Sequence, residues 1–231
     1  MSAEHRLSPA GLYGKHPGFG DFIAAGLPDD SLKPLGDWMQ SALGEWRSWA
    51  GEAWQGLFDR SPCLGFWIGP ALLAGQALRG VWMPSRDRTG RRFPLLVAQS
   101  GGVAPIMEPA RDFYDAAAVA LASLHDCEAF EPRSMVERLQ SELPAATSES
   151  PAWPTFWALN PQLDPASLLG NLRDADHAHA SAARSYWWFA GEAERPSGVL
   201  ACQGWPGLAE LGWLIAGGQQ TGEANAGEDV A

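Results

Sequence analysis

The chain has 231 residues, of which 46% are hydrophobic and 19% are charged, and its formal net charge is -11. This amount of apolar material is sufficient for a packed core, and it excludes an intrinsically disordered chain. The acidic balance argues against a protein whose main task is to neutralise nucleic-acid phosphates, and against a polybasic binder of membrane surfaces.

Membrane insertion and secretion are also disfavoured. No stretch approaches the roughly 20 apolar residues of a transmembrane helix, and the first nine residues lack a basic segment followed by an apolar run. The three cysteines, Cys63, Cys127 and Cys202, are widely separated and lack CxxC spacing, which predicts neither a disulfide framework nor a zinc site. Cys63 and Cys202 have apolar neighbours and are predicted to be buried. Together these features favour the cytoplasm.

A short strand at residues 12–14 opens the chain, and a glycine-rich turn follows it. The clearest element comes next, because apolar residues recur at steps of three and four over residues 35–57. This spacing is typical of one face of an amphipathic helix. Asp30 or Ser31 is expected to cap the start of this helix, with Pro34 in its first turn.

The middle of the chain has the pattern of a buried sheet. Residues 64–68 are apolar and aromatic and end before a Gly-Pro pair, which indicates a buried strand. Two further strands are predicted at residues 78–83 and 93–99. The polar loop between them, residues 84–92, contains Thr-Gly, so we predict a hairpin with a long, shaped loop.

Helices and strands continue to alternate after this hairpin. The predicted elements are a helix opened by Pro109, a shorter helix opened by Glu131-Pro132, an internal boundary loop at 144–154, a strand at 155–159, a helix at 164–172, strands at 186–190 and 198–202, and a final helix opened by Pro206.

Interleaved helices and strands with at least one hairpin predict an α/β fold. We expect a mixed, partly antiparallel central sheet with helices on both faces, which is a three-layer sandwich. Residues 1–216 are predicted to form a single α/β domain. Residues 217–231 are rich in Gly, Gln, Glu and Asn, so we expect a disordered acidic tail there.

The glycine-rich turn does not carry a nucleotide-binding motif. Gly18 and Gly20 follow a strand, but position 23, where a dinucleotide fingerprint has its third glycine, is Ile23. Gly14-Lys15 lacks both the upstream glycine and the following Ser or Thr of a phosphate-binding P-loop. We interpret the segment as a tight turn and predict no cofactor.

No catalytic residue and no metal site is predicted. His177 and His179 would share one face of a strand and touch one metal, but their Ala-rich, polar surroundings favour a solvated loop. His16 lies in the glycine-rich turn, where a chance neighbour is favoured over a catalytic base. Ser85 ends a strand and is expected to be exposed, but the chain has no Gly-x-Ser-x-Gly elbow and no assigned base.

The hairpin loop concentrates positive charge in an acidic protein. It carries Arg86, Arg88, Arg91 and Arg92 around a single carboxylate, Asp87. One interpretation is a cradle for an anion or phosphopeptide, or a protein-docking loop. Another is a loop held by its own Asp–Arg pairs. Binding of single-stranded nucleic acid is the weakest interpretation, because the net charge opposes it.

Two segments resemble the TagF family of type VI secretion systems. Residues 13–22, with Gly-Leu-Pro at 26–28, are similar to the family's opening Gly-Lys-x-Pro-x-x-Gly-Asp-Phe, and residues 83–95 are similar to its second signature. A Trp-rich helix separates the two, as in the family, and the resemblance is sharp over roughly the first 100 residues. The matching positions are Gly14, Lys15, Pro17, Gly20, Asp21, Phe22, Pro84, Ser85, Asp87, Gly90, Arg91, Phe93 and Pro94.

The resemblance implies a non-catalytic, post-translational repressor of a type VI secretion system, without a cofactor. It implies a protein partner, the forkhead-associated (FHA) scaffold protein of that system, and it gives the matching positions a partner-binding or structural role. We expect the two loops to meet at one end of the sheet, where Asp21 or Asp87 pairs with Arg91. The alternatives are a ligand-sensing or enzymatic domain with a small anion site built from the Asp21 and 87–92 loops, and a purely structural subunit.

Overall fold

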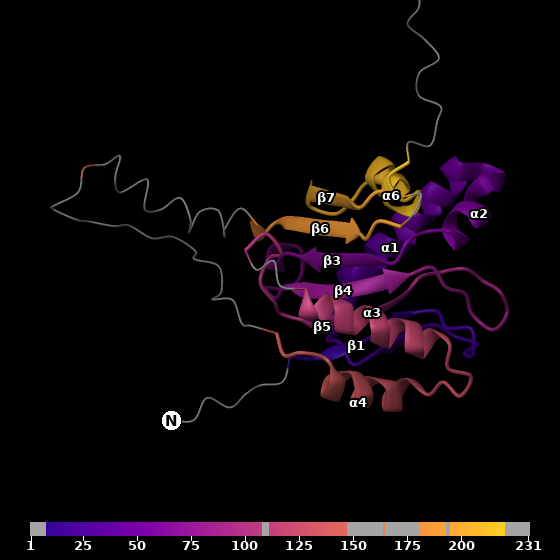
Figure 1. Ribbon diagram of the computed structural model, residues 1–231, viewed down its shortest axis with the longest axis horizontal. Coiled ribbons are helices and arrows are strands. Elements are labelled where there is room, and N and C mark those ends of the chain that lie inside the picture. The colour runs from indigo at the N-terminus through magenta and orange to yellow at the C-terminus, as the bar shows by residue number, and fades with distance from the viewer. Residues whose placement is uncertain (1–7, 108–110, 147–163, 165–180, 193–194, 220–231) are drawn as a thin grey trace, which may run out of the picture.

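The computed structural model describes residues 8–107, 111–146, 164, 181–192 and 195–219 (Figure 1). The predicted strand at 155–159, all but the first residue of the predicted helix at 164–172, and both His177 and His179 lie outside the described residues.

The described strands form one seven-stranded sheet in the order β2-β1-β5-β4-β3-β6-β7, and every neighbouring pair is antiparallel. The α/β class predicted from the sequence is confirmed, with a sheet that is antiparallel throughout its described pairs rather than mixed. The strands are β1 (Ala10–Gly14), β2 (Ile23–Ala25), β3 (Leu64–Ile68), β4 (Leu78–Met83), β5 (Leu95–Ser100), β6 (Arg184–Phe189) and β7 (Gly198–Gln203).

The predicted hairpin is present. β4 and β5 pair from Leu78↔Ser100 to Met83↔Leu95, and residues 84–94 connect them. β2 was not predicted, because three residues are too few to show an alternating pattern. It forms the edge of the sheet beside β1, and it places the residues after the glycine-rich turn close to the β4–β5 loop.

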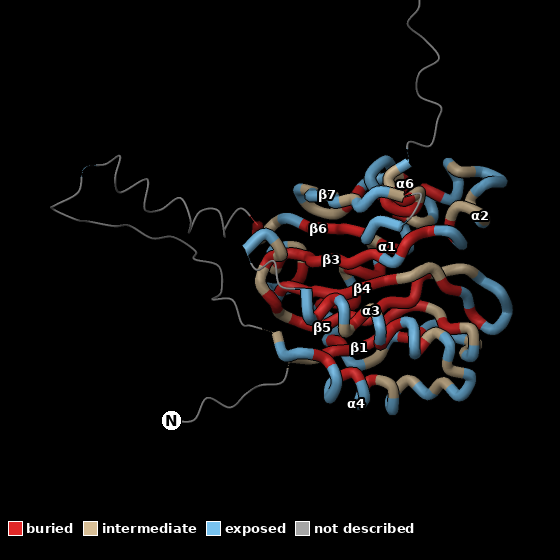
Figure 2. The backbone as a smooth tube through the Cα atoms, in the orientation of Figure 1, coloured by how far each residue is buried: buried red, intermediate tan, exposed pale blue. Residues whose placement is uncertain are grey.

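Helices cover both faces of the sheet, so the predicted three-layer arrangement is confirmed. Successive strand residues point to opposite faces. Phe66 therefore joins the core under α1, α2 and α6, whereas Trp67 joins the core under α3 and α4. Figure 2 shows the central strands buried along their length, between helices that are buried on one side. The helices are α1 (Asp29–Ala50), α2 (Trp54–Asp59), α3 (Asp112–His125), α4 (Pro132–Glu142) and α6 (Leu208–Ile215), with short 3₁₀ turns at Gly51–Ala53 and Pro70–Leu72.

The long amphipathic stretch is broken where the sequence pattern suggests continuity. α1 ends at Ala50, and Gly51 adopts φ 56°, a conformation that glycine accepts most readily. The chain then turns into α2, which lies against the end of α1. The predicted cap is wrong as well, because Pro28 precedes the first turn and no side chain caps it. Pro34 consequently lies in the second turn.

The last described residues close α6. The Gly218 amide donates to the Trp213 carbonyl at 2.9 Å and the Gly217 amide donates to the Leu214 carbonyl at 3.1 Å, which satisfies carbonyls at the helix end. Residues 220–231 of the predicted tail lie outside the described residues. None of the helices in the described ranges has both the length and the apolar character needed to cross a membrane.

The cysteines differ from expectation. All three are free, and Cys63 is exposed while Cys202 is half-buried, so the prediction that both are buried is wrong. Cys63 directly precedes β3, and Cys202 lies on the edge strand β7, where alternate residues face solvent.

Candidate functional site

The two motif segments meet around the carboxylate of Asp87. Its Oδ2 accepts from Lys15 Nζ at 2.9 Å and from Arg91 Nε at 2.6 Å. Its Oδ1 accepts from the Thr89 amide at 2.9 Å, the Thr89 hydroxyl at 2.7 Å and the Arg91 amide at 3.0 Å. We call these four residues the Asp87 network. The predicted meeting of the loops is confirmed, and so is the Asp87–Arg91 pair.

The Asp87 network holds a fully buried charge. The Asp87 side chain is 0% exposed, and that of Lys15 is 14% exposed. Burial opposes ionisation of Asp87, but the hydrogen bonds from Lys15, Thr89 and Arg91 outweigh it and hold the pKa of this carboxyl well below its usual range. Asp21, the other carboxylate considered for this pair, is exposed and makes no hydrogen bond or ion pair within the described part of the chain.

Backbone contacts join the same two loops. The Lys15 amide donates to the Pro94 carbonyl at 3.2 Å, and the Arg88 amide donates to the Phe19 carbonyl at 3.0 Å. Arg91 Nη2 donates to the Gly20 carbonyl at 3.0 Å. Gly14 has φ 123°, and a Cβ there would collide with the Pro94 carbonyl. These contacts account for Gly14 and Pro94 by close packing of backbone, and Gly20 contributes its carbonyl as the acceptor for Arg91.

An aromatic cluster supports the network from β1. The ring of Tyr13 lies 4.8 Å from that of Phe22 and 6.2 Å from that of Phe93, and Phe22 lies 4.9 Å from Phe93, all edge-on. Such pairs stabilise beyond their buried area. Phe22 remains 39% exposed, so it is both a packing residue and part of the surface.

The remaining loop positions have structural surroundings. Ser85 is buried, so the expectation that it is exposed is wrong, and its hydroxyl has no hydrogen-bond partner in the described residues. The Gly90 amide donates to the Asp87 carbonyl at 2.9 Å in a turn where Gly90 has φ 84°. Pro17 and Pro84 are half-buried beside these turns.

His16 is a buried structural residue. Its Nε2 contacts the Leu124 carbonyl at 2.7 Å, and its Nδ1 accepts from the Gly18 amide at 3.0 Å. This pairing assigns the neutral tautomer with the proton on Nε2. The ring stacks on Phe130 at 3.9 Å. Burial lowers the pKa of His16. The residue therefore ties the first motif to the end of α3, and sequence spacing did not indicate this role.

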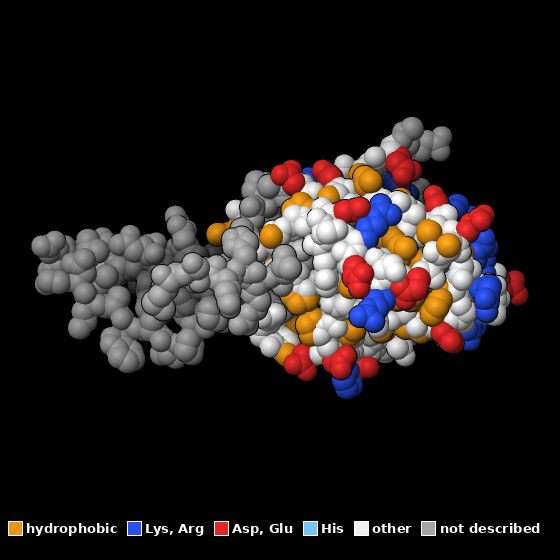
Figure 3. Space-filling model, turned by 90° about the horizontal axis from the view of Figure 1, so that it is seen from below, with side chains coloured by type: hydrophobic (Ala, Val, Ile, Leu, Met, Phe, Trp, Pro, Cys, Tyr) orange, Lys and Arg blue, Asp and Glu red, His pale blue; other side chains and the backbone are white. Residues whose placement is uncertain are grey.

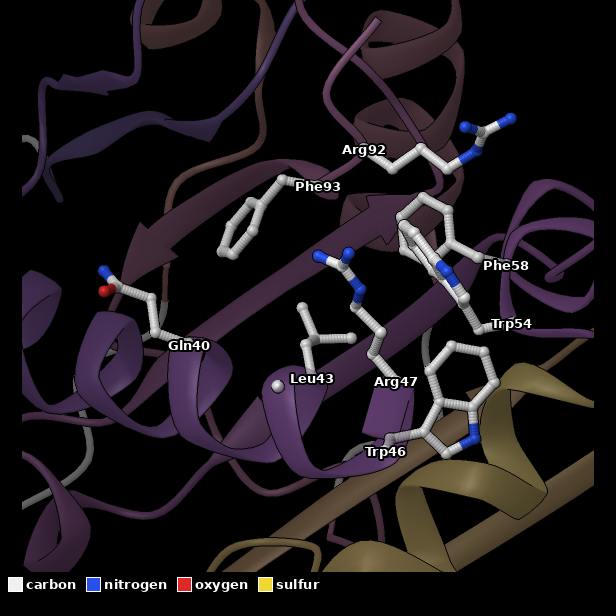
Figure 4. A pocket seen from close by; sticks show the side chains of 9 residues that line it. Gln40, Leu43, Trp46, Arg47, Trp54, Phe58, Arg92 and Phe93 are labelled. Atoms are coloured by element: carbon white, nitrogen blue, oxygen red, sulfur yellow. The ribbon is translucent and has the colours of Figure 1, made fainter. Parts of the chain in front are cut away.

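A pocket of about 220 Å³ opens on the other side of the hairpin loop, between α1 and α2 (Figure 4). Spacing along the chain did not reveal it, because its walls come from distant segments. They are α1 (Gln40, Leu43, Gly44, Trp46 and Arg47), α2 (Trp54 and Phe58) and the residues before β5 (Arg92 and Phe93).

Two guanidinium groups flank one indole ring in this pocket. Arg47 Cζ lies 4.7 Å from the centre of the Trp54 ring and Arg92 Cζ lies 5.8 Å from it. Arg92 also forms a two-pronged pair with Asp59, with both N···O distances 2.7 Å. Arg47 makes no ion pair in the described part of the chain.

Gly44 is the unusual residue of the pocket wall. Glycine in the middle of a helix costs about 0.5–1 kcal/mol relative to alanine. A Cβ at Gly44 would have no atom within 4 Å, so close packing does not require glycine at this position.

Positive side chains gather at this end of the molecule. Figure 3 shows a group of Lys and Arg side chains at the right-hand end, where Figure 1 places the β4–β5 loop. Arg86 and Arg88 are exposed there and make no ion pair within the described residues. Nowhere in the described ranges do three His, Cys, Asp or Glu side chains gather as metal ligands would.

The two motif loops lie within the part of the chain that is similar to a known protein family. A family model described as the TagF N-terminal domain, type VI secretion system-associated, matches residues 11–146 and includes both motif segments. The chain belongs to the TagF family. Among solved structures, that of PA0076 from Pseudomonas aeruginosa PAO1 is similar, with 29% sequence identity and a TM-score of 0.71. The similarity covers 94% of this chain and 99% of that one. No curated protein is detectably similar in sequence.

The family match ends before the sheet is complete. β6 and β7 lie beyond residue 146, yet β6 pairs with β3, and Trp187 packs in the same core as Phe66 at a ring distance of 5.2 Å. The similarity to PA0076 extends over these later strands, because it covers nearly the whole of both chains.

Proposed function

We propose that this TagF-family chain is a non-catalytic regulator that represses a type VI secretion system after translation, by docking on the FHA scaffold protein in the cytoplasm. Membership in a family associated with type VI secretion supports the secretion-related part of this proposal. The mode of action and the partner come from the sequence resemblance, and the architecture of the motif loops supports them.

The saturated Asp87 carboxylate is the observation that carries the proposal. It accepts five hydrogen bonds, it is fully buried, and its pKa is held low. A general base needs an accessible carboxylate with a pKa near the working pH. Asp87 instead uses its charge to fix the loop, and this presents Arg86 and Arg88 to solvent in a defined arrangement.

The same geometry disfavours an anion site shared by the two carboxylate loops. Asp87 points into its own loop, and exposed Asp21 would repel an anion. The surface beside them combines exposed arginines with the partly exposed ring of Phe22. Arginine and aromatic side chains are enriched at protein interfaces, so this surface suits a protein partner.

The test is calorimetric titration of the purified chain with the FHA scaffold protein. Wild type is expected to bind, and the double variant Arg86→Ala/Arg88→Ala is expected to bind at least about tenfold more weakly, since interface arginines are frequent hot spots. Both arginines are exposed, so the variant is expected to fold, which circular dichroism would verify.

Arg133→Ala is the control for loss of an exposed arginine, because Arg133 is also exposed but lies on α4, outside the β4–β5 loop. It is expected to bind like wild type. Absence of any binding by wild type would overturn the proposed partner. Equal binding by wild type and the double variant would remove the loop arginines from the interface.

A further inference from the structure

The pocket between α1 and α2 is lined by apolar walls with one free cation. Leu43, Trp54, Phe58 and Phe93 provide the apolar surface, and Figure 4 shows Arg47 reaching from α1 into the space between Phe93 and Trp54. The break at Gly51 creates this arrangement, because it turns α2 back so that Trp54 faces Arg47.

The two arginines of the pocket are electrically different. Asp59 neutralises Arg92, whereas Arg47 has no carboxylate partner in the described part of the chain. Contact with the Trp54 ring orients the Arg47 guanidinium without cancelling its charge. The pocket therefore presents one uncompensated positive charge, in a protein whose net charge is -11.

Gly44 is a second, independent observation. It weakens α1 by comparison with alanine, and no neighbouring atom demands a glycine there. Gly44 lines the pocket on the same stripe of the helix as Arg47, and a Cβ there would point into open space.

The residues that line the pocket suit a carboxylate better than a free phosphate. A free phosphate is normally held by several convergent donors, but here the Arg47 guanidinium lies among mainly apolar walls, and the Gln40 side chain hydrogen-bonds Tyr13. A carboxylate carried on a peptide suits this lining better, since the neighbouring side chain can cover Trp54 and Phe93. A volume of about 220 Å³ matches one or two side chains.

We propose that this pocket binds an acidic side chain, with an apolar neighbour, presented by the protein partner. The inference rests on the proposed function, because it takes the FHA scaffold protein as that partner. Arg47 would pair with the carboxylate, and Trp54 with Phe93 would pack on the apolar neighbour.

The experiment is calorimetry of the full chain with the FHA scaffold protein, using two pocket variants. Arg47→Glu reverses the free charge and is expected to weaken binding at least about a hundredfold, since truncating a hydrogen-bonded charge pair already costs that much. Gly44→Leu fills the pocket mouth and is expected to weaken binding about tenfold.

Matched controls separate the pocket from general effects. Gly44→Ala adds one methyl group and strengthens the helix, so it is expected to raise the melting temperature and to bind within about twofold of wild type. Arg133→Glu makes the same charge change on α4 and is expected to bind like wild type, apart from a small effect of net charge.

Each outcome decides the proposal. If wild type does not bind the scaffold, the proposed function fails and this inference fails with it. If wild type binds the scaffold and both pocket variants bind it as tightly as wild type does, the proposed function stands and the pocket assignment is overturned. A third measurement adds inorganic phosphate at about 20 mM, a concentration suited to a weak anion competitor. If phosphate displaces the scaffold from wild type but does not change the residual binding of Arg47→Glu, the site is a phosphate site and the carboxylate assignment is wrong.

Discussion

Two neighbouring arginines of the β4–β5 loop, Arg91 and Arg92, each pair with a carboxylate, and the two pairs differ in burial and in hydrogen bonding. In the Arg91–Asp87 pair the carboxylate is 0% exposed and accepts five hydrogen bonds, while in the Arg92–Asp59 pair the carboxylate is 48% exposed and meets one guanidinium. A buried charge that loses its partners is expensive, whereas an exposed pair contributes little to stability. We conclude that the first pair shapes the loop and that the second orients a surface arginine.

The largest expected effect tests the buried side of this comparison. Asp87→Ala leaves Lys15, Thr89 and the Arg91 amide without their acceptor, and it is expected to lower the free energy of unfolding by about 3–5 kcal/mol. Urea denaturation at pH 7 measures this. Because the pKa of Asp87 is low in the folded state, its contribution to stability is fully present above about pH 4 and decreases progressively as the pH falls below that value. The difference in the free energy of unfolding between Asp87→Ala and wild type should therefore become smaller in acid. A difference that does not change with pH would contradict the ionic role of Asp87.

His16 extends the comparison to a buried group that is neutral. His16→Ala removes the hydrogen bond to the Leu124 carbonyl, which keeps the Cys127 amide as donor, leaves the Gly18 amide without its acceptor and removes the stacking on Phe130, for an expected loss of about 2–3 kcal/mol. Burial lowers the pKa of His16 in the folded state, so the unfolded chain takes up a proton more readily than the folded protein as the pH falls through about 6.5. Wild type should lose stability as the pH falls through 6.5, and the variant should lose less. If the stabilities of wild type and His16→Ala changed in parallel with pH, the assignment of His16 as a neutral buried group would be wrong.

Lys15 offers an intermediate case. Lys15→Met removes one of the two cationic partners of Asp87 but keeps the buried methylene chain. Arg91 and Thr89 still satisfy the carboxylate, so the expected loss is about 1–2 kcal/mol. Chemical denaturation of this variant beside Asp87→Ala measures how much of the stabilisation by the Asp87 network comes from Lys15. A loss as large as that of Asp87→Ala would show that Lys15 alone stabilises the carboxylate.

The smallest effect is expected at the exposed pair. Asp59→Ala should change the free energy of unfolding by less than about 1 kcal/mol, because solvent screens the Arg92–Asp59 interaction. Urea denaturation of Asp59→Ala beside wild type and Asp87→Ala measures this change. Since the variant leaves both Arg47 and Arg92 unpaired, it is also expected to strengthen binding of an acidic partner. A loss above 2 kcal/mol, about twice the usual ceiling for such a pair, would erase the contrast between the two pairs.

The local patterns were predictable where neighbouring residues determine them. Leu78–Met83 and Leu95–Ser100 are strongly apolar and flank a polar loop with Thr-Gly, so the hairpin followed from sequence. The break in the long helix did not, because the apolar spacing continues across Gly51 and only its positive φ reveals the turn. β2 was missed because it is short, and its partner β1 rather than its own sequence makes it a strand.

The candidate site shows the same division. Sequence comparison identified the motif loops and predicted that a carboxylate pairs with Arg91, but it left Asp21 and Asp87 as equal candidates. Both are acidic residues close to a glycine, and spacing carries no information on which is buried. The fold decides in favour of Asp87 by placing Lys15 and Thr89 around it.

By itself, the sequence determined the α/β class, the two motif loops and the family, because these depend on hydrophobic periodicity, turn residues and short motifs that are contiguous in the chain. The tertiary structure alone decided that Asp87 is a saturated structural charge, that His16 is a neutral buried link, and that Arg47 and Trp54 form a pocket with Phe93. Burial and charge compensation arise between residues far apart in the chain, so they are set only when the sheet and its helices are packed.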